Sequence, residues 1–151
     1  MGALRIPSRG ASYLDISAII YSVERNEPYF TLLAPVWRQA EAGQLTVVCS
    51  EMVIAETLVK PLREGHAELE AAFRAVFAAP EVQLVPATRQ VWEDAARIRV
   101  ASGLKTPDAL HAATALRSGC ALFITNDTDF RRVRNLPIVV LDDLLAEEGQ
   151  A

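Results

Sequence analysis

The sequence predicts one α/β domain with a central, mainly parallel five-stranded sheet and helices on both faces. Short apolar runs of strand length alternate with longer segments of helical periodicity, which is the pattern of a parallel sheet covered by helices. The run ALFIT, residues 121–125, has no polar face, as expected of a central strand that is buried on both sides. The chain has 151 residues, of which 51% are hydrophobic, so it can form a single domain with a sizeable core.

Each expected strand is an apolar run that ends at a turn or cap residue, and these runs are residues 12–15, 45–49, 82–85, 121–125 and 138–141. The helices between them are marked by cap and stop residues. They are expected over residues 18–24, 29–42, 51–60, 65–78, 89–103 and 107–118, with a short last helix after Asp142. The expected N-caps are Ser17, Ser50, Thr88 and Thr106, and Pro61 is expected to close the third helix.

The start of the chain does not look like a targeting signal. Residues 1–11 lack the apolar stretch of a secretory signal peptide and are expected to form a flexible leader, followed by the domain over residues 12–148. No apolar run reaches the roughly 18 residues that a membrane span requires. Cys49 and Cys120 each lie beside an apolar strand and show no metal-type spacing, so two buried thiols in a reducing cytoplasm are expected.

Net charge limits the kind of partner. The formal charge of −4 argues against a wholly basic nucleic-acid-binding surface. It does not exclude a nuclease, because an acidic metal site contributes negative charge that its cations neutralise.

Acidic residues fall where the ligand-binding edge of such a sheet is expected. Asp15 ends the first strand, Asp127 follows the fourth, and Asp108 lies in the first turn of the helix before that strand. Ligands of open α/β sheets bind at the carboxyl ends of the strands, so these three side chains are expected to gather at one edge. A fourth acid, Glu56, lies within an apolar helical surface, where an unpaired carboxylate is costly.

Taken singly, each acid has a structural explanation. Asp15 could cap a helix, Asp108 could interact with the helix dipole, and Asp127 could serve as a turn residue. Glu56 could pair with Lys60, one helical turn later. Taken together, crowded carboxylates cannot all ionise without a cation, and oxygen ligands without Cys or His select Mg²⁺ or Mn²⁺. Such ions polarise a phosphodiester and activate a water for in-line attack.

Four segments in this order and spacing resemble PIN-domain ribonucleases, and most of all the VapC-type toxins of toxin–antitoxin pairs. They read YLDISAI, SEMVIAETL, TPDALHAATA and FITNDTDF, and the resemblance extends from Tyr13 to Leu144. It implies a single PIN-like domain. The acidic catalytic and metal-site residues of the family fall on Asp15, Glu56, Asp108 and Asp127, its supporting polar residues on Ser17 and Thr125, and a further acid that shares the metal or binds its waters on Asp129.

The resemblance also implies an activity and partners. It implies an endoribonuclease that cleaves RNA with Mg²⁺, or with Mn²⁺, as the toxin of a type II toxin–antitoxin system. It further implies a homodimer and an antitoxin protein that blocks the site. From the residues themselves, Arg131 and Arg132 follow the Asp127 loop and are candidates to contact RNA phosphates, with a solvated turn as the alternative. His111 follows Asp108 by three positions and could contact substrate, but a helix-packing role is expected.

Two other functions fit the same fold class. A signalling receiver domain also has a doubly wound sheet and accepts a phosphoryl group beside Mg²⁺. It normally has an acidic pair after the first strand and a lysine after the last, and this sequence has neither. A PIN-like module that binds without cutting is the other alternative, and the retention of all four acids argues against it.

Overall fold

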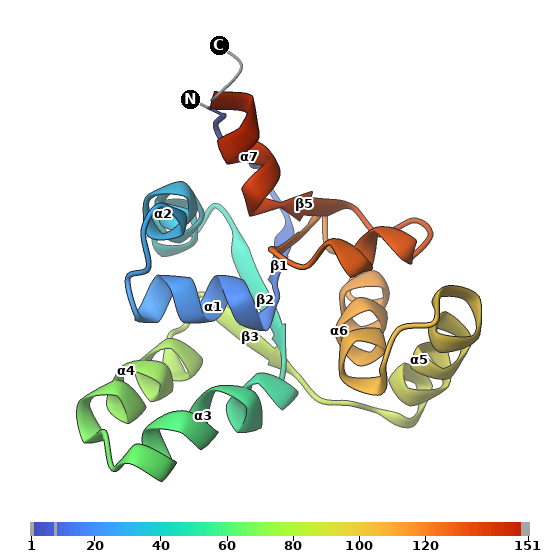
Figure 1. Ribbon diagram of the computed structural model, residues 1–151, viewed down its shortest axis with the longest axis horizontal. Coiled ribbons are helices and arrows are strands. Elements are labelled where there is room, and N and C mark those ends of the chain that lie inside the picture. Colours follow the sequence, from blue (N-terminus) through green and yellow to red (C-terminus); the bar gives the residue numbers. More distant parts are fainter. Residues whose placement is uncertain (1, 8, 149–151) are drawn as a thin grey trace.

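Five parallel strands form the sheet that positions the candidate site. The computed structural model describes residues 2–7 and 9–148. The strands are β1 (Ala11–Leu14), β2 (Thr46–Ser50), β3 (Val82–Val85), β4 (Leu122–Thr125) and β5 (Ile138–Val140). They lie in the order β3-β2-β1-β4-β5, and each pair of neighbours is parallel (Figure 1). The predicted five-stranded sheet is confirmed, and its four pairings are all parallel.

Helices cover both faces of this sheet. They are α1 (Ile16–Val23), α2 (Tyr29–Glu41), α3 (Met52–Glu64), α4 (Ala67–Ala78), α5 (Arg89–Ser102), α6 (Thr106–Arg117) and α7 (Leu141–Glu148), and a 3₁₀-helix, η1 (Thr128–Arg132), follows β4. Helices α1 to α4 lie on one side of the sheet, and α5 and α6 lie on the other (Figure 1).

The sheet separates two hydrophobic cores. Leu14 and Ile124 belong to the core that packs against α1 to α4, whereas their chain neighbours Tyr13 and Phe123 belong to the core beneath α5 and α6. This division follows from the strand geometry, in which successive side chains point to opposite faces. Because both faces are covered, the strands are apolar on both sides, which explains the uninterrupted apolar runs of the sequence.

The order in which the chain adds strands to the sheet reverses at β1. The sheet grows from β1 through β2 to β3, and the chain then returns to place β4 and β5 on the other side of β1. Such a switch point opens a crevice at the carboxyl ends of the two strands that flank it, here β1 and β4. Leu14 is in register with Ile124, so Asp15 and Thr125 reach this edge side by side.

Some predicted helix ends need correction. Helix α1 begins at Ile16 with Asp15 in the N-cap position, so Ser17 lies inside the helix and does not cap it. Helix α3 continues through Pro61, because a proline in the last turns removes little of the helical hydrogen bonding, and it ends at Gly65, whose φ of 63° is left-handed. Thr106 is the first residue of α6 and is not its cap. At α5 the prediction is confirmed: the Thr88 hydroxyl accepts a hydrogen bond from the Val91 N–H at 3.3 Å.

The segment before β1 contacts the domain. Leu4 is buried in the core beside α1 to α4, and Ile6 packs against the same core. The flexibility expected over residues 1–11 stays a prediction, and residues 1 and 8 of that range lie outside the described part of the chain.

Both cysteines are buried and free, as predicted. Burial raises the pKa of the Cys49 thiol to about 12 and that of Cys120 to about 11. Both side chains are therefore un-ionised thiols near neutral pH. Within the described residues, no helix combines the length and the apolar character that crossing a membrane requires.

Candidate active site

Asp15 is the most deeply buried of the four acids, with only 3% of its surface exposed. Its backbone N–H donates to the carbonyl of Ile124 at 3.0 Å, which brings the carboxylate beside Thr125. The Thr125 hydroxyl donates to Asp15 Oδ2 at 2.7 Å. The other oxygen, Asp15 Oδ1, is buried and has no hydrogen-bond partner among the described residues. A buried carboxylate oxygen without a partner is costly, so this atom is suited to a cation or to a water that a cation binds.

Asp127 lies just beyond β4, in a turn that hydrogen bonds hold in place. Its backbone N–H donates to the Thr125 hydroxyl at 3.0 Å, and its Oδ1 accepts from the backbone N–H of Asp129 at 2.9 Å. The Ser17 hydroxyl accepts from the N–H of Asn126 at 3.2 Å. Ser17 and Thr125, the two predicted supporting residues, therefore both bind the turn that carries Asp127.

Asp108 lies in the first turn of α6 and shares the electrostatic environment of the other acids. Burial raises the pKa of Asp108, and the negative charges of Asp127, Asp15 and Glu56 raise it further. Burial likewise raises the pKa of Asp15 from its ordinary value, and the charge of Glu56 acts in the same direction. The charges of Asp15, Glu56 and Asp127 thus all act on Asp108, and each of them disfavours its ionisation.

Glu56 has a different partner from the one its sequence context suggested. Lys60 pairs with Glu24 at 3.1 Å, and Glu56 Oε1 instead lies 2.8 Å from His111 Nε2. The Glu56 side chain is also 26% exposed, so it is less buried than expected. The reason is that α3 is not covered on all sides: Val59, for example, is 49% exposed.

His111, for which the sequence favours helix packing over substrate contact, is hydrogen-bonded to the candidate site. It is completely buried, and both ring nitrogens are hydrogen-bonded, Nδ1 to the Tyr13 hydroxyl at 2.5 Å and Nε2 to Glu56. Its Nε2 also lies 3.9 Å from Asp15 Oδ1. The sequence offers one signal, the position of His111 about one helical turn after Asp108 on the same helix. The two partners that give it a role are distant in sequence.

The predicted peripheral residues lie on the turn after Asp127. The Asp129 carboxylate accepts a hydrogen bond from Arg132 at 3.0 Å, and Arg131 pairs with Asp143 of α7. These four side chains are each about half exposed. Each arginine therefore has an acidic partner but remains accessible to solvent.

The donor set is compatible with an ion held partly through water. One oxygen each of Asp15, Glu56 and Asp127 accepts a hydrogen bond from the protein. Across residues 2–7 and 9–148, no three His, Cys, Asp or Glu side chains are arranged to hold an ion directly. Mg²⁺ commonly keeps several of its waters and binds one or two carboxylates, so it does not require such a group.

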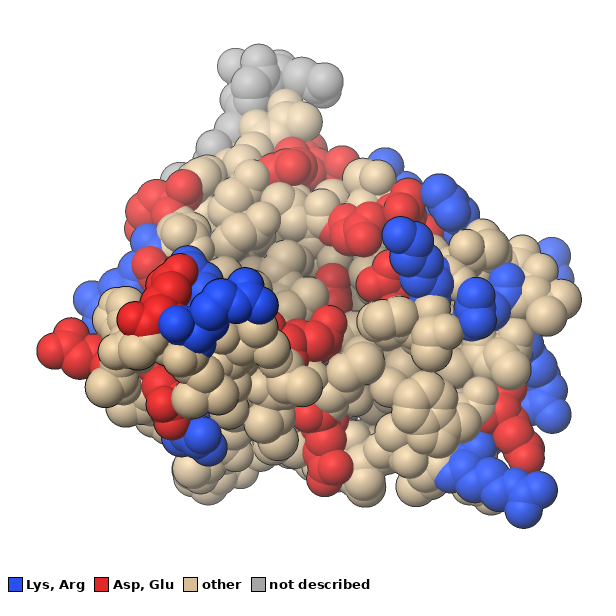
Figure 2. Space-filling view, turned by 60° about the horizontal axis from the view of Figure 1, so that its bottom comes forward, with Lys and Arg blue, Asp and Glu red and all other residues tan. Residues whose placement is uncertain are grey.

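Charge is unevenly distributed on the surface. On the face shown in Figure 2, acidic side chains gather along the middle, and most Lys and Arg side chains lie to either side. A groove of about 510 Å³ lies between α1, α2 and α4, with Phe30 and Trp37 in its wall, and none of the four acids lines it. The chemistry that the acids can support is therefore separate from this groove.

Comparison with known proteins gives the family and the fold. Sequence comparison with curated proteins gave no match. Among solved structures, VapBC2 from Rickettsia felis bound to a DNA fragment from its promoter is 17% identical, with a TM-score of 0.68, covering 86% of this chain and 98% of that one. VapC20 from Mycobacterium tuberculosis, a sarcin–ricin loop cleaving toxin, is 18% identical, with a TM-score of 0.64, covering 80% of this chain and 92% of that one.

A toxin–antitoxin complex from Klebsiella pneumoniae is 21% identical, with a TM-score of 0.63, covering 85% of this chain and 96% of that one. At these identities, the likeness shows a shared fold. The sequence model of the PIN domain matches residues 12–136, which include most of β1, all of β4 and all four acids. That match removes the receiver-domain alternative. Because it spans most of the sequence, and because the fold agrees, the chain belongs to the PIN-domain family.

Proposed function

We propose that this PIN domain is a metal-dependent endoribonuclease whose ion, Mg²⁺ or Mn²⁺, is held by Asp15, Glu56, Asp108 and Asp127. The observation that carries the proposal is the buried Asp15 Oδ1, which has no partner among the described residues and belongs to a carboxyl group whose pKa, like that of Asp108, is raised by burial and by the charge of neighbouring acids. A divalent cation supplies the charge that these carboxylates need, and an oxygen-only ligand set suits Mg²⁺ or Mn²⁺.

Some residues of the site would bind the ion, and others position the residues that bind it. A bound ion would polarise the RNA phosphodiester and lower the pKa of an attacking water. Thr125 holds Asp15 and Asp127 next to each other, because its hydroxyl donates to one and accepts from the backbone of the other. We propose that Asp129, which is about half exposed, binds waters of the ion. Both cysteines are poor nucleophiles here, because burial keeps their thiols protonated.

The biological role that we propose is that of the toxin in a type II toxin–antitoxin system. The structural neighbours described above are toxins or toxin–antitoxin complexes, and one of them cleaves RNA. We propose that an antitoxin protein blocks the acidic site, for example with an arginine that pairs with the carboxylates in place of the ion. We also propose a homodimer, which the exposed apolar side chains Ile54, Val59 and Leu62 of α3 support.

Cleavage of a defined single-stranded RNA with Mg²⁺ and with chelator tests the proposed activity. The non-catalytic alternative predicts RNA or protein binding without cleavage under either condition.

Removing one of the crowded charges is expected to stabilise the metal-free protein. Asp108→Asn should melt higher than wild type in chelator near neutral pH, by on the order of 2–4 °C for each kcal/mol of relieved repulsion. The folded state raises the pKa of Asp108, so protonated Asp108 favours folding, and that stability is lost as pH rises through the raised pKa. The advantage of the variant should therefore vanish below about pH 4. Differential scanning fluorimetry across pH measures this difference.

The matched control for this experiment is Asp94→Asn. Asp94 lies 3.2 Å from Arg97 and 2.8 Å from Arg117, so its neutralisation removes attractive contacts and should not raise the melting temperature. If Asp108→Asn and wild type melt together at every pH in chelator, the repulsion within the acidic site is absent.

The RNA phosphate contact predicted for Arg131 and Arg132 is the remaining proposal. Arg132 pairs with an acid only three residues away on the exposed turn beside Asp127, so it can turn toward a phosphate at little cost. Arg132→Ala is expected to weaken RNA binding and to reduce the slope of log K against log salt by about 0.7 for each phosphate that the variant no longer neutralises. Arg131→Ala should act in the same direction.

Binding for this comparison is measured in an Asp15→Asn background, to prevent cleavage. Arg74→Ala is the matched control, because Arg74 forms a similar exposed local pair, with Glu70 on α4. Equal affinity and equal salt dependence of the Arg132→Ala and Arg74→Ala proteins would remove Arg132 from the RNA-binding surface.

A further inference from the structure

A chain of hydrogen bonds runs from β2 to Glu56 through two buried side chains. The backbone N–H of Ser50 donates to the Tyr13 hydroxyl at 3.1 Å, this hydroxyl lies 2.5 Å from His111 Nδ1, and His111 Nε2 lies 2.8 Å from Glu56 Oε1. Tyr13 and His111 are both completely buried. Their phenol and imidazole rings also meet edge to face, with centroids 5.8 Å apart. The pair is thus a fixed part of the interior.

The hydrogen-bond partners favour one arrangement of the protons. The Tyr13 hydroxyl oxygen accepts from the Ser50 N–H, and His111 Nδ1, 2.5 Å away, is the acceptor that the phenol proton can reach. Burial raises the pKa of Tyr13 well above its ordinary value, which keeps that proton on the phenol. With Nδ1 as the acceptor, the imidazole proton lies on Nε2 and faces the Glu56 carboxylate. The reverse tautomer would leave the Tyr13 proton without an acceptor and set a nitrogen lone pair against a carboxylate.

The hydrogen bond between His111 and Glu56 links the two halves of the domain. His111 belongs to α6 and Glu56 to α3, and these helices lie on opposite sides of the sheet (Figure 1). The Glu56 side chain is long and 26% exposed, so it loses considerable conformational freedom when its carboxylate is held. The bond spans the carboxyl edge of the sheet and directs Glu56 toward the site of Asp15.

We propose that His111 is the positioning residue for Glu56 and that Tyr13 fixes the His111 tautomer for this role; the proposal rests on the metal site of the proposed function. His111 Nε2 lies 2.8 Å from Glu56 Oε1 and 3.9 Å from Asp15 Oδ1, so its single proton bonds Glu56 and leaves the Asp15 oxygen free for the cation. Partners that orient a ligating carboxylate in this way typically contribute 10- to 100-fold to metal affinity.

Two substitutions of His111 separate its two hydrogen bonds. His111→Asn keeps an acceptor near the Nδ1 position for Tyr13 but is too short to reach Glu56. His111→Gln places an amide N–H near the Nε2 position and so restores a donor to Glu56. Mn²⁺ affinity, measured by electron paramagnetic resonance on the unliganded protein, is expected to fall roughly 10- to 100-fold in His111→Asn and by less in His111→Gln. Thr114→Val, a buried change on the same helix, should lower the melting temperature without this loss.

A double-mutant cycle tests whether His111 acts through Glu56. If it does, adding His111→Asn to Glu56→Gln should lower Mn²⁺ affinity by less than about threefold, because the carboxylate that His111 orients is already gone. A purely structural role predicts that the two losses multiply. Full multiplication, or wild-type affinity in His111→Asn, would overturn the proposal.

The tautomer can be read from the protein without any substitution at His111. The chain has two histidines, so a His66→Gln variant assigns the imidazole signals of His111. Long-range ¹H–¹⁵N correlation spectra are expected to show His111 protonated on Nε2 and bare on Nδ1. A proton on Nδ1 would contradict the proposal. A protein that binds Mn²⁺ as described but cuts no RNA would refute the nuclease function and leave the positioning role intact.

Discussion

Asp15→Asn is expected to lower the rate of RNA cleavage by at least roughly 100-fold, since even residues that only orient a metal ligand contribute up to that amount. The substitution keeps the size of the side chain and leaves an oxygen for the Thr125 hydroxyl, which lies 2.7 Å from Oδ2 in the wild-type protein. It removes the negative charge and can place an N–H at the buried position where a cation needs an oxygen. The rate is measured under single-turnover conditions on a defined single-stranded RNA.

RNA affinity should be retained in this variant, because removing a negative charge does not repel phosphate. Asp94→Asn on α5 is the control of identical chemistry, and it should cut like wild type, because Asp94 pairs with Arg97 and Arg117 and not with the site. If Asp15→Asn cuts RNA at the wild-type rate, any cleavage arises from another site or from a contaminant.

Phe123→Ala is expected to cost about 3–5 kcal/mol of folding free energy, a large share of the ~5–15 kcal/mol that typically stabilises a domain. Phe123 is completely buried in the middle of β4. Its ring stacks on that of Tyr13, with ring centroids 5.0 Å apart, and lies tilted against the ring of Phe130, with centroids 4.7 Å apart. The cavity would therefore loosen both the Tyr13–His111 pair and the start of the turn that follows Asp127. Urea denaturation of the two proteins measures the difference.

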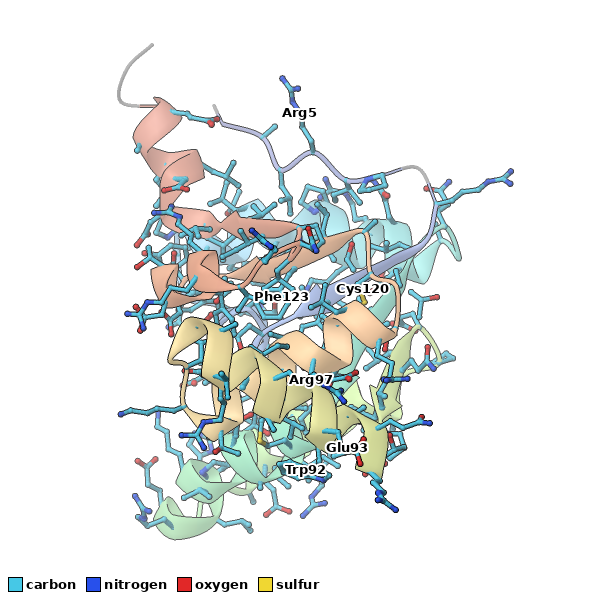
Figure 3. All side chains as sticks on the ribbon, turned by 90° about the vertical axis from the view of Figure 1, so that its right-hand side faces the viewer. Arg5, Trp92, Glu93, Arg97, Cys120 and Phe123 are labelled. Atoms are coloured by element: carbon cyan, nitrogen blue, oxygen red, sulfur yellow. The ribbon has the colours of Figure 1, made fainter. Side chains whose placement is uncertain are left out.

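Val100→Ala provides the contrast for this measurement. Val100 is 91% exposed, and its truncation is expected to change stability by less than about 0.5 kcal/mol. Figure 3 shows a similar contrast between helix and sheet. Trp92, Glu93 and Arg97 lie on α5 at the outside of the domain, whereas Phe123 lies among the strands. A Phe123→Ala protein as stable as Val100→Ala would mean that the core beneath α5 and α6 is not packed as described.

The fold could be predicted because its signals are local. The strand over residues 82–85, the Thr88 cap and the Gly103 stop all coincide with the structure, since each depends on a few neighbouring residues. The predicted end of α3 at Pro61 is wrong, because a proline near a helix end is tolerated and the left-handed Gly65 terminates the helix instead. The sequence alone does not decide whether Pro61 or Gly65 ends the helix.

The candidate site could be predicted only in part, for a similar reason. Asp15, Asp108 and Asp127 are proposed from their positions at element ends, and the parallel topology places the carboxyl ends of the strands at one edge of the sheet. The partner of Glu56 could not be predicted, because His111 lies 55 residues away and on the opposite side of the sheet. The local choice, Lys60, is physically reasonable for a helix but pairs with Glu24 in the folded chain.

The most direct test of a metal-dependent site built on Asp15 is a Mg²⁺ titration of RNA cleavage by wild type and Asp15→Asn side by side, beginning from chelator-treated protein. We expect no cleavage in chelator, a wild-type rate that rises with Mg²⁺ and saturates, and an Asp15→Asn rate that stays low throughout. Restoring Mg²⁺ to chelated wild type should restore the full rate. Cleavage that is equally fast in chelator, or an Asp15→Asn curve that coincides with that of wild type, would contradict a metal-dependent nuclease site built on Asp15.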